Sequence, residues 1–455
     1  MKYDNLRGKK VVVLGLSVSG TAAAKCLNRH GADVWLSEYS QADNLSQKET
    51  IENLKKLGIK VETGGHSDKF IENSQLVVTS PSVPQDSPIM KELTKRGIEV
   101  ISEVELASKL TTKPFIAITG TNGKTTTTAL TAHILNSEYV AEPCGNYGKP
   151  PCDLVDNSDI DYFVCECSSF QLAYSPEFRP KISVFTNFTP DHITWHKTLE
   201  NYFGAKARIF KSKQAPEYAV LNAKDEKLKD FARQLNTTVF FFGDELGENC
   251  SYVKDDMIFF KQNGVEEKII DLKDCPFIGE HNWQNAECAI ICAKLEGISS
   301  ENIKKSIMSF EVPEHRLEKF AQYNGITFYN DSKATNPEAS LVAIKSFNDE
   351  DVVLIAGGRD KLTDLTEFCE AVKEHISTVI LIGEATERFE ESLIKQSFTN
   401  IIKEKSMERS VERAIELKPD VVLLSPACAS FDMFSGYEER GKVFKADVLS
   451  KIGKN

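Results

Sequence analysis

The sequence predicts an α/β protein of three domains, each built on a mainly parallel sheet. Short apolar runs alternate with helical stretches along the whole chain, which is the order expected of doubly wound sheets. Glycine-rich turns follow the first predicted strand of the first and second segments. A chain of 455 residues has room for about three domains at roughly 100–200 residues each. We place them at residues 1–107, 108–312 and 313–455.

Composition and charge exclude several classes of protein. The net charge of −12 disfavours nucleic-acid binding, which needs a basic face. No apolar run approaches the length of about 18 residues that a membrane span needs, and the polar Met1 to Lys10 stretch lacks a signal-peptide core, so we expect a cytoplasmic protein. The 11 cysteines are scattered, which favours a reducing compartment. Among them, Cys165 and Cys167 are interpreted as small buried hydrophobes.

The first segment has the pattern of a Rossmann-like, nucleotide-binding unit. Strands are predicted at Val11–Leu14 and Asp33–Ser37, with a helix at Thr21–Arg29 between them. The turn Gly15-Leu-Ser-Val-Ser-Gly20 is a relaxed form of the dinucleotide turn, with Ser17 in place of the middle glycine. Glu38, at the end of the second strand, would face a ribose. We expect the nucleotide part of a ligand here, and favour that over NAD. A later strand is predicted at Gln75–Thr79.

The strongest signal is Gly120-Thr-Asn-Gly-Lys-Thr-Thr126, between the predicted strand Phe115–Ile118 and a helix. Glycines let backbone N–H groups turn toward an anion, and the helix N-terminus adds positive potential. Lys124 would reach the outer phosphates of a nucleotide, and the Thr125 hydroxyl would face Mg²⁺. The spacing is tighter than in the GxxxxGK[ST] form. The sequence therefore predicts a variant phosphate loop in a P-loop-type ATPase domain.

Polar residues follow two further strands of the second segment. Glu166 ends the predicted strand Asp161–Cys165, and His192 follows the strand Lys181–Phe185. Carboxyl ends of parallel strands meet at one edge of a sheet, where ligands bind. Glu166 would hold Mg²⁺ or steer an attacking amine, and His192 would ligate metal or hold a carboxylate. The stretch from Tyr202 to Arg208, with Lys206, reads by itself as a solvated cationic helix face. Further strands are predicted at Tyr218–Asn222 and Thr238–Phe242, and a helix from Glu280 to Leu295.

The third segment predicts a second Rossmann-like, doubly wound unit. Its strands are expected at Thr327–Tyr329, Val352–Ala356, Thr378–Ile382 and Asp420–Leu424. Lysines and hydroxyls cluster after these strands, which suits an anionic ligand that carries carboxylates. Arg316, at the junction with the second domain, would contact phosphate only when the domains close.

These motifs resemble the Mur ligase family, over all three domains and in order. The stretches that carry the resemblance are Thr119 to Thr125, Glu166 to Gln171, Asn187 with Asp191-His192, His281-Asn282, His315-Arg316 and Asp331 to Asn336. Within the family, the third segment is similar to the member that adds D-glutamate. The resemblance implies ATP-dependent ligation of D-glutamate to UDP-N-acetylmuramoyl-L-alanine through an acyl phosphate, in cytoplasmic peptidoglycan precursor synthesis. It also implies a monomer.

The resemblance implies roles for residues in each domain. The catalytic set would be Lys124, Glu166, His192 and Lys206. ATP would be bound by Gly120, Thr121, Asn122, Gly123, Lys124, Thr125, Thr126, Asn282, Asn285, Arg316 and Asp331. The UDP substrate would be bound by Leu16, Ser17, Glu38, Tyr39, Asn146, Ser168 and Gln171. D-glutamate would be bound by Lys333, Thr335, Lys361, Ser430 and Tyr437. Mg²⁺ would occupy two sites, with ligands from Thr125, Glu166, His192 and, as a CO₂-derived carbamate, Lys206.

Three alternatives stay open at this point. One is another Mur-type or folylpolyglutamate-type amide ligase. The motifs of the third domain favour a D-glutamate ligase over this alternative. A second is a nicotinamide-dependent oxidoreductase built on Gly15 to Gly20, which leaves the phosphate loop unexplained. The third is a nucleotide-binding regulator without catalysis. It is disfavoured because every position expected to bind metal or phosphate carries a suitable residue.

Overall fold

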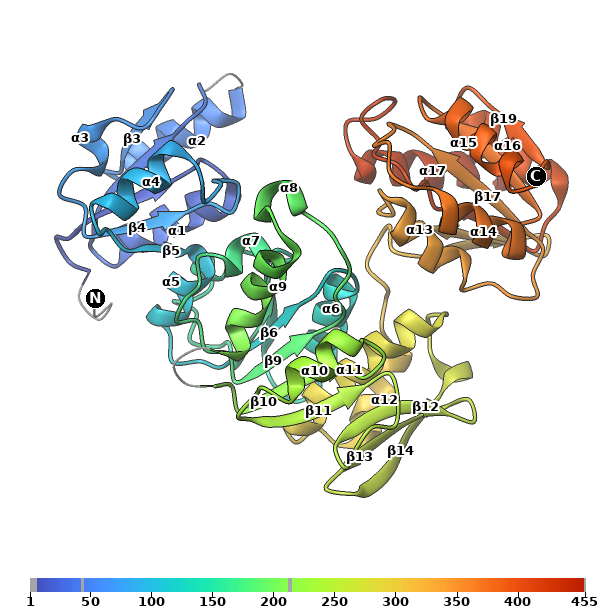
Figure 1. The fold of residues 1–455 in the computed structure, drawn as a ribbon, viewed down its shortest axis with the longest axis horizontal. Coiled ribbons are helices and arrows are strands. Elements are labelled where there is room, and N and C mark those ends of the chain that lie inside the picture. Colours follow the sequence, from blue (N-terminus) through green and yellow to red (C-terminus); the bar gives the residue numbers. More distant parts are fainter. Residues whose placement is uncertain (1–5, 42–44, 212–214, 454–455) are drawn as a thin grey trace. The chain divides into compact units, whose positions relative to one another are not determined.

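The computed structural model describes residues 6–41, 45–211 and 215–453, and it has the predicted α/β architecture with three sheets (Figure 1). Its contacts group into two compact units. The first comprises residues 1–275 and 284–309, and the second comprises residues 276–283 and 310–455. The domain boundaries that we placed after residues 107 and 312 stay predictions. Among the described residues, no helix is both long and apolar enough to cross a bilayer.

The first sheet is five-stranded and parallel, in the order β3-β2-β1-β4-β5. Its strands are β1 (Lys10–Leu14), β2 (Asp33–Glu38), β3 (Lys60–Thr63), β4 (Leu76–Thr79) and β5 (Val100–Ser102). The helices of this part are α1 (Val18–Arg29), α2 (Leu45–Lys56), α3 (Asp68–Ile71), α4 (Pro88–Lys95) and α5 (Glu103–Leu110). The order turns at β1, and a sheet of this kind binds ligands at the carboxyl ends of its strands near such a switch point.

The second sheet has nine strands in the order β14-β13-β12-β11-β10-β9-β6-β8-β7. Strands β6 to β11 are all parallel to their neighbours. They are β6 (Phe115–Thr119), β7 (Ala141–Gly145), β8 (Tyr162–Glu166), β9 (Ile182–Phe185), β10 (Tyr218–Asn222) and β11 (Thr238–Phe242). Strand β6 lies between β8 and β9, so three strand ends that carry polar motifs adjoin one another.

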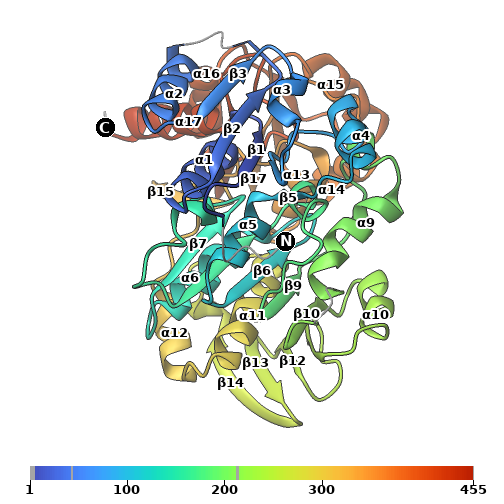
Figure 2. The ribbon, with the colours of Figure 1, turned by 90° about the vertical axis from the view of Figure 1, so that its left-hand side faces the viewer.

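An antiparallel ribbon extends this sheet, and the sequence analysis did not predict it. It consists of β12 (Cys250–Lys254), β13 (Met257–Gln262) and β14 (Val265–Asp271). Helix α6 (Lys124–Leu135) packs against β7 (Figure 2) and against β8. The other helices of this part are α7 (Ser169–Leu172), α8 (Ile193–His196), α9 (Leu199–Ala207), α10 (Glu226–Ala232), α11 (Glu280–Leu295) and α12 (Ser300–Met308), with short 3-10 turns η1 (Pro151–Asp153), η2 (Arg208–Phe210) and η3 (Leu272–Asp274).

The third sheet lies in the second unit, in the order β15-β16-β20-β17-β18-β19, with only β15 antiparallel. Its strands are β15 (Glu318–Tyr323), β16 (Ile326–Asn330), β17 (Val352–Gly357), β18 (Thr378–Ile382), β19 (Ile401–Lys403) and β20 (Val421–Leu424). Alternate residues of β17 enter different cores: Leu354 packs with α13 (Pro337–Ile344), α14 (Thr366–His375) and α15 (Thr386–Lys395). Ile355 packs with α16 (Met407–Leu417) and α17 (Tyr437–Ile452). Helices on both faces confirm the doubly wound prediction.

Every strand that the sequence analysis placed is present, with each end within one residue of the expected position. The first helix starts earlier than expected, at Val18, because the Ser17 side chain caps it by accepting from Gly20 N–H. Cys165 and Cys167 are fully buried in the core beside α7, as the structural interpretation of these thiols predicted.

Candidate active site

The loop between β6 and α6 depends on two glycines. Gly120 has φ of 149° and Gly123 has φ of 82°, in the half of backbone space that L side chains avoid. A Cβ atom on Gly120 would lie 1.9 Å from Thr186 Oγ1, and one on Gly123 would lie 2.5 Å from Asn285 Oδ1. Gly123 is also the N-cap of α6. The loop therefore turns directly into a helix N-terminus, where backbone N–H groups and the helix dipole favour an anion.

The end of β9 holds this loop in place. The N–H groups of Thr121 and Asn122 donate to Asn187, to its backbone oxygen at 3.0 Å and its Oδ1 at 2.8 Å. Thr186 Oγ1 donates to the Asn122 carbonyl oxygen over 2.6 Å. Asn187 was part of the family resemblance without a role of its own, and the structure makes it a support of the loop.

Lys124 lies over the loop that it belongs to. Its Nζ donates to the carbonyl oxygens of Gly120 and Thr121, at 3.0 and 2.7 Å. The ammonium is thereby held at the mouth of the loop. A nucleotide phosphate placed there would meet a cation that is already in position, in addition to the N-terminal amides of α6.

Two other residues predicted for the site, Thr125 and Asn146, meet at Glu166. The Thr125 hydroxyl donates to Glu166 Oε2 over 2.7 Å, and Asn146 Nδ2 donates to Oε1 over 2.6 Å. Glu166 is buried, and both of its oxygens face polar partners from other elements. A hydroxyl and a carboxylate in contact are the oxygen ligands that Mg²⁺ prefers, so these side chains fit the predicted metal.

Lys206 is a buried lysine beside the phosphate loop, where the sequence alone read it as solvated. It is 2% exposed, and its Nζ donates to the Gly120 carbonyl oxygen over 2.5 Å. Burial lowers the pKa of the Lys206 ammonium well below its usual range, and the nearby Lys124 charge lowers it further. Deprotonation of Lys206 is therefore easier than that of an exposed lysine. This contact connects α9 to the loop, and the carbamate that the family resemblance implies at Lys206 stays a prediction.

His192 reaches the site from the turn before α8. Its backbone has φ of 53°, and its ring lies 4.7 Å from that of Phe170 and 6.0 Å from that of Tyr202. Tyr202 also carries Lys206 Nζ 4.8 Å above its ring. An aromatic cluster thus groups His192 with Lys206, while Asp191 pairs with the imidazole at 3.4 Å.

His196 is a neighbour that the sequence analysis missed. Its Nε2 lies 2.9 Å from Ser169 Oγ, and its ring stacks on Phe170. Burial lowers the pKa of His196 to about 4, with His192 and Lys206 adding to the effect. A neutral imidazole here links α8 to the N-terminus of α7. No motif includes His196, so nothing in the sequence signalled its burial.

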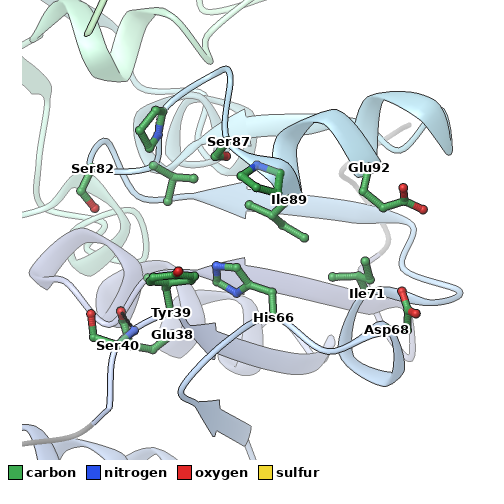
Figure 3. A pocket seen from close by; sticks show the side chains of 14 residues that line it. Glu38, Tyr39, Ser40, His66, Asp68, Ile71, Ser82, Ser87, Ile89 and Glu92 are labelled. Atoms are coloured by element: carbon green, nitrogen blue, oxygen red, sulfur yellow. Dashed lines mark hydrogen bonds between the residues drawn. The ribbon is translucent and has the colours of Figure 1, made fainter. Parts of the chain in front are cut away.

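A cavity of about 570 Å³ opens at the carboxyl edge of the first sheet (Figure 3). The predicted Glu38 and Tyr39 line it, together with His66, Ser82 and Ile89. The Tyr39 and His66 rings lie side by side, 5.9 Å apart. Glu38 accepts hydrogen bonds from the N–H groups of Leu16 and Ser40, at 2.6 and 2.9 Å. The edge thus offers flat rings and a fixed carboxylate, and His66 is a lining residue that we did not predict.

Other predicted UDP contacts lie in adjacent cavities. One of about 470 Å³ is lined by Ser17, Asn146 and Gln171, and one of about 380 Å³ is lined by Leu16 and Ser17. Ser168 lines neither of these: it caps α7 in a capping box with Gln171. The structure therefore brings Ser17, Asn146 and Gln171 together, with Ser168 acting on the turn behind them.

In the second unit, Asp331 is the buried acid of the strand-end cluster. Ser425 Oγ donates to its Oδ2 over 2.7 Å, and the Leu317 N–H donates to its Oδ1 over 3.1 Å. Burial raises the pKa of Asp331 to about 7, against the opposing effect of these hydrogen bonds and of Arg316 and Arg440. The carboxyl group joins the loops after β16 and β20.

The predicted D-glutamate residues surround the same strand ends. Lys333 Nζ lies 5.1 Å from the Tyr437 ring, and Thr335 follows on the same loop. Ser430 is buried, in a loop tied to the next one because the Arg359 N–H donates to the Ala429 carbonyl oxygen over 2.8 Å. Lys361 is exposed on that next loop. Two lysines and hydroxyls thus line one edge of the third sheet.

The residues predicted for ATP are divided between the units. Asn285 lies at the phosphate loop, where its Oδ1 accepts from Thr127 Oγ1 over 3.0 Å. Asn282, Arg316 and Asp331 belong to the second unit, and Asn282 Nδ2 donates to the Ile278 carbonyl oxygen over 2.8 Å. Their approach to a nucleotide stays a prediction.

These features are those of an α/β enzyme that handles a nucleoside triphosphate. The chain belongs to the Mur ligase family: residues 9–102 match the MurD-like N-terminal domain, residues 118–293 the Mur ligase middle domain, and residues 315–428 the glutamate ligase domain. It is 43% identical over 453 residues to a UDP-N-acetylmuramoylalanine--D-glutamate ligase of Thermoanaerobacter pseudethanolicus, covering 97% of this chain and 98% of the relative. The ligase of that name in Clostridioides difficile is 37% identical over 455 residues, covering 98% and 99%.

Solved structures agree with this fold. The structure of MurF from Acinetobacter baumannii superposes with a TM-score of 0.61 at 16% identity, covering 96% of this chain and 93% of that one. UDP-N-acetylmuramate-alanine ligase MurC from Thermotoga maritima gives a TM-score of 0.59 at 20% identity, covering 97% and 99%. MurF ligase of Thermotoga maritima, solved in complex with ADP, gives 0.59 at 15% identity, covering 99% and 97%.

Proposed function

We propose that this chain joins D-glutamate to UDP-N-acetylmuramoyl-L-alanine at the expense of ATP, in cytoplasmic peptidoglycan precursor synthesis. The observation that carries the proposal is near full-length identity of 37–43% to ligases that bear this name. The phosphate loop, Glu166 and the lysine-rich edge of the third sheet are consistent with it. We retain a cytosolic monomer as part of the proposal.

The reaction has two steps. A carboxylate oxygen of the UDP substrate attacks the γ-phosphorus of ATP, and the bond to the bridging oxygen breaks, which gives an acyl phosphate and ADP. The D-glutamate amine then attacks the acyl carbon and loses a proton, and phosphate leaves from the tetrahedral intermediate. Both the attacking carboxylate and the phosphate are anions. We assign Lys124 and the α6 N-terminus to neutralise this charge, because preorganised cations act most strongly where charge develops.

Thr125 and Glu166 would hold a first Mg²⁺, and Glu166 and His192 would serve a second. The ion would supply Lewis-acid stabilisation of the phosphate oxygens. In the protein itself, Asn146 orients the Glu166 carboxylate through the 2.6 Å hydrogen bond, and Asn187 fixes the loop that receives the phosphates. These supports keep the oxygen ligands in place before the substrates bind.

We also propose that Lys206 reacts with CO₂ to form a carbamate. Addition of CO₂ to a neutral amine forms an N–C bond and releases one proton, and the lowered pKa of Lys206 increases the fraction of this reactive form. The resulting anion would lie beside the Gly120 carbonyl and near Lys124. Carbon-13 NMR with labelled bicarbonate should give a carbamate resonance that Lys206→Met removes and that Lys254→Met, on an exposed strand end, retains. A spectrum without that resonance would reject the carbamate and leave the ligase assignment intact.

The remaining assignments follow the cavities. The uridine nucleotide would occupy the cavity of Glu38 and Tyr39, with Leu16 and Ser17 on the adjoining turn, and the muramoyl part would face Asn146 and Gln171. ATP would reach Asn285 at the loop. Asn282, Arg316 and Asp331 would contact it on domain closure, and D-glutamate would bind the edge that carries Lys333, Thr335, Lys361, Ser430 and Tyr437.

Phosphate release tests the function directly. ATP and UDP-N-acetylmuramoyl-L-alanine are supplied with D-glutamate, L-glutamate, meso-diaminopimelate, L-lysine or no amino acid. We expect release only with D-glutamate, abolished in Lys124→Met and retained in Lys254→Met. Release with a different amino acid would point to another Mur-type or folylpolyglutamate-type ligase. ATP binding without release in any mixture would favour the non-catalytic regulator.

A further inference from the structure

Three potential metal ligands of three different kinds converge at the C-terminal end of α1. Cys26 Sγ, a ring nitrogen of His30 and a carboxylate oxygen of Asp156 all lie within 4.8 Å of one another. His30 Nε2 is 3.0 Å from Asp156 Oδ1. The phosphate-loop residues contribute nothing to this cluster, and Ser17, which lines the UDP cavities, caps the opposite end of the helix.

The local structure explains why these side chains meet. Cys26 and His30 are four residues apart at the end of α1, so they share one face of the helix. Asp156 follows η1, and η1 packs against α1. Cys152, within η1, is fully buried, and its hydrogen bond with Cys26, after burial, raises the pKa of its thiol. A second thiol therefore adjoins the first.

We propose that this cluster is a structural zinc site, with Cys26, His30 and Asp156 as ligands. Cys152 would become the fourth once its thiol, which donates to the Glu103 carbonyl oxygen over 3.5 Å, turns toward the ion. Tetrahedral Zn²⁺ takes sulfur at about 2.3 Å and nitrogen or carboxylate oxygen at about 2.0–2.2 Å, which puts ligand atoms roughly 3.3–3.8 Å apart. To reach this geometry, His30 Nε2 and Asp156 Oδ1, which lie 3.0 Å apart, must separate slightly, and ligand atoms near the 4.8 Å limit must approach one another. The bound ion would join α1 of the first sheet to the η1 segment of the second.

Arg29 supports the arrangement. Its Nε donates to Asp156 Oδ2 over 2.8 Å, and its Nη2 donates to the Cys152 carbonyl oxygen over 2.9 Å. Oδ1 of Asp156 is thereby directed toward His30. Arg29 holds the carboxylate in place, as residues that hydrogen-bond to metal ligands usually do. On binding, each thiol gives one proton to solvent, and His30 coordinates through Nε2 with its proton on Nδ1.

Cobalt substitution tests this site without the catalytic reaction. The full chain is treated with a chelator and reduced, then titrated with Co²⁺ in the absence of ATP. We expect thiolate-to-cobalt charge-transfer absorption that saturates at one equivalent and is displaced by Zn²⁺. A Mg²⁺ site made of Thr125 and Glu166 has no thiolate and gives no such band. Zn²⁺ should also raise the melting temperature of the wild type.

Matched variants assign the ligands. Cys26→Ser should lose the thiolate band, and His30→Gln should weaken Co²⁺ binding at least about tenfold. The His30 side chain is 29% exposed, so His30→Gln should fold and remain informative even if Cys26→Ser does not fold. Asp159→Asn, on an exposed residue just after Asp156, should bind like the wild type. The proposal is overturned if no thiolate band forms, if His30→Gln leaves binding unchanged, or if the protein contains a Cys26–Cys152 disulfide as purified.

Discussion

Thr125 and Glu166 lie 41 positions apart in the chain, yet the Thr125 hydroxyl donates to Glu166 Oε2 over 2.7 Å. The pairing arises because β6 and β8 are parallel neighbours, with Ile118 beside Glu166 in the register. The carboxyl ends of both strands therefore lie at one edge of the sheet, where Glu166 ends β8 and Thr125 lies at the start of α6, the helix that follows β6. A hydroxyl from the phosphate loop and an acid from the next strand form one oxygen-lined position, and this position organises the proposed site.

Glu166→Gln tests whether the charge at this position matters. The amide keeps the size of the side chain and an oxygen for the Thr125 hydroxyl, but it lacks the negative charge that a divalent cation needs. We expect kcat to fall by about 10²–10³ and the Mg²⁺ requirement to rise, while the melting temperature changes little. Steady-state kinetics at several Mg²⁺ concentrations measure both.

The control for this substitution is Glu226→Gln, which alters a side chain that is 83% exposed. It should behave as the wild type. Full activity of Glu166→Gln at ordinary Mg²⁺ concentrations would rule out a metal role for this carboxylate.

Gly123→Ala should damage nucleotide binding. The left-handed backbone costs an alanine roughly 1–2 kcal/mol, and its Cβ would lie 2.5 Å from Asn285 Oδ1. We expect the loop to shift and ATP affinity to drop at least tenfold in calorimetric titration. Gly204→Ala is the matched control, because Gly204 lies within α9 with nothing within 4 Å of its added Cβ. There, alanine should stabilise by about 0.5–1 kcal/mol. Equal ATP affinity in both variants would refute the steric argument.

Asp331 should make the protein less stable as pH rises. Its folded pKa of about 7 exceeds the ordinary value of 3.8, so between these values the folded state binds more protons than the unfolded state. The free energy of unfolding then decreases with pH across that window and is flat above it. Asp331→Asn cannot ionise, and it should be more stable than the wild type at pH 8 by something on the order of 3 kcal/mol.

Urea denaturation of both proteins from pH 4 to pH 8 measures this difference, and subtraction removes the effect of other acids such as Glu103 and Glu105. A difference that does not vary with pH would show that Asp331 is ionised throughout. The same variant should lose activity if the carboxylate serves ATP as proposed.

The parallel parts of the fold were predictable because each signal is local. The stretch from Phe115 to Thr126 contains a buried strand, two glycines and the start of a helix. Interactions between residues close in the sequence determine each of these features. The β12–β14 ribbon was missed although Asn263-Gly264 is a strong hairpin signal; both residues have positive φ, at 51° and 79°. Its strands mix continuous apolar runs with charged stretches, so the alternation of apolar and polar residues expected of a half-buried strand is not visible.

The contacts that complete the site are of long range, and no local pattern contains them. Asn285 meets Thr127 across 158 positions, and Lys206 meets Gly120 across 86. Only the family resemblance singled out Asn285 and Lys206 in advance. Neither a motif nor the family resemblance included His196 or His66. Only the packing of α8 and of the first sheet reveals that these two side chains lie at the site.

Arg440 should prove to be a positioning residue for the third sheet. It is 1% exposed, and its guanidinium donates to Ser332 Oγ, the Ser332 carbonyl oxygen and the Cys428 carbonyl oxygen, at 3.0, 2.7 and 3.0 Å. It thereby joins the loop that carries Lys333 to the loop that carries Ser430. Arg440→Met would leave two buried carbonyls without this donor, at about 1–3 kcal/mol each.

We therefore expect Arg440→Met to lower stability and to raise the KM for D-glutamate more than the KM for ATP, because the proposed amino-acid site lies on the two loops that it joins. Arg440→Lys keeps the charge but not the planar fork, so it should fall between methionine and wild type. Arg413→Met, on a side chain that is 49% exposed in α16, is the control and should change neither quantity. A uniform rise in all KM values, or an unchanged KM for D-glutamate in a destabilised protein, would show that Arg440 supports the fold without positioning the amino-acid loops.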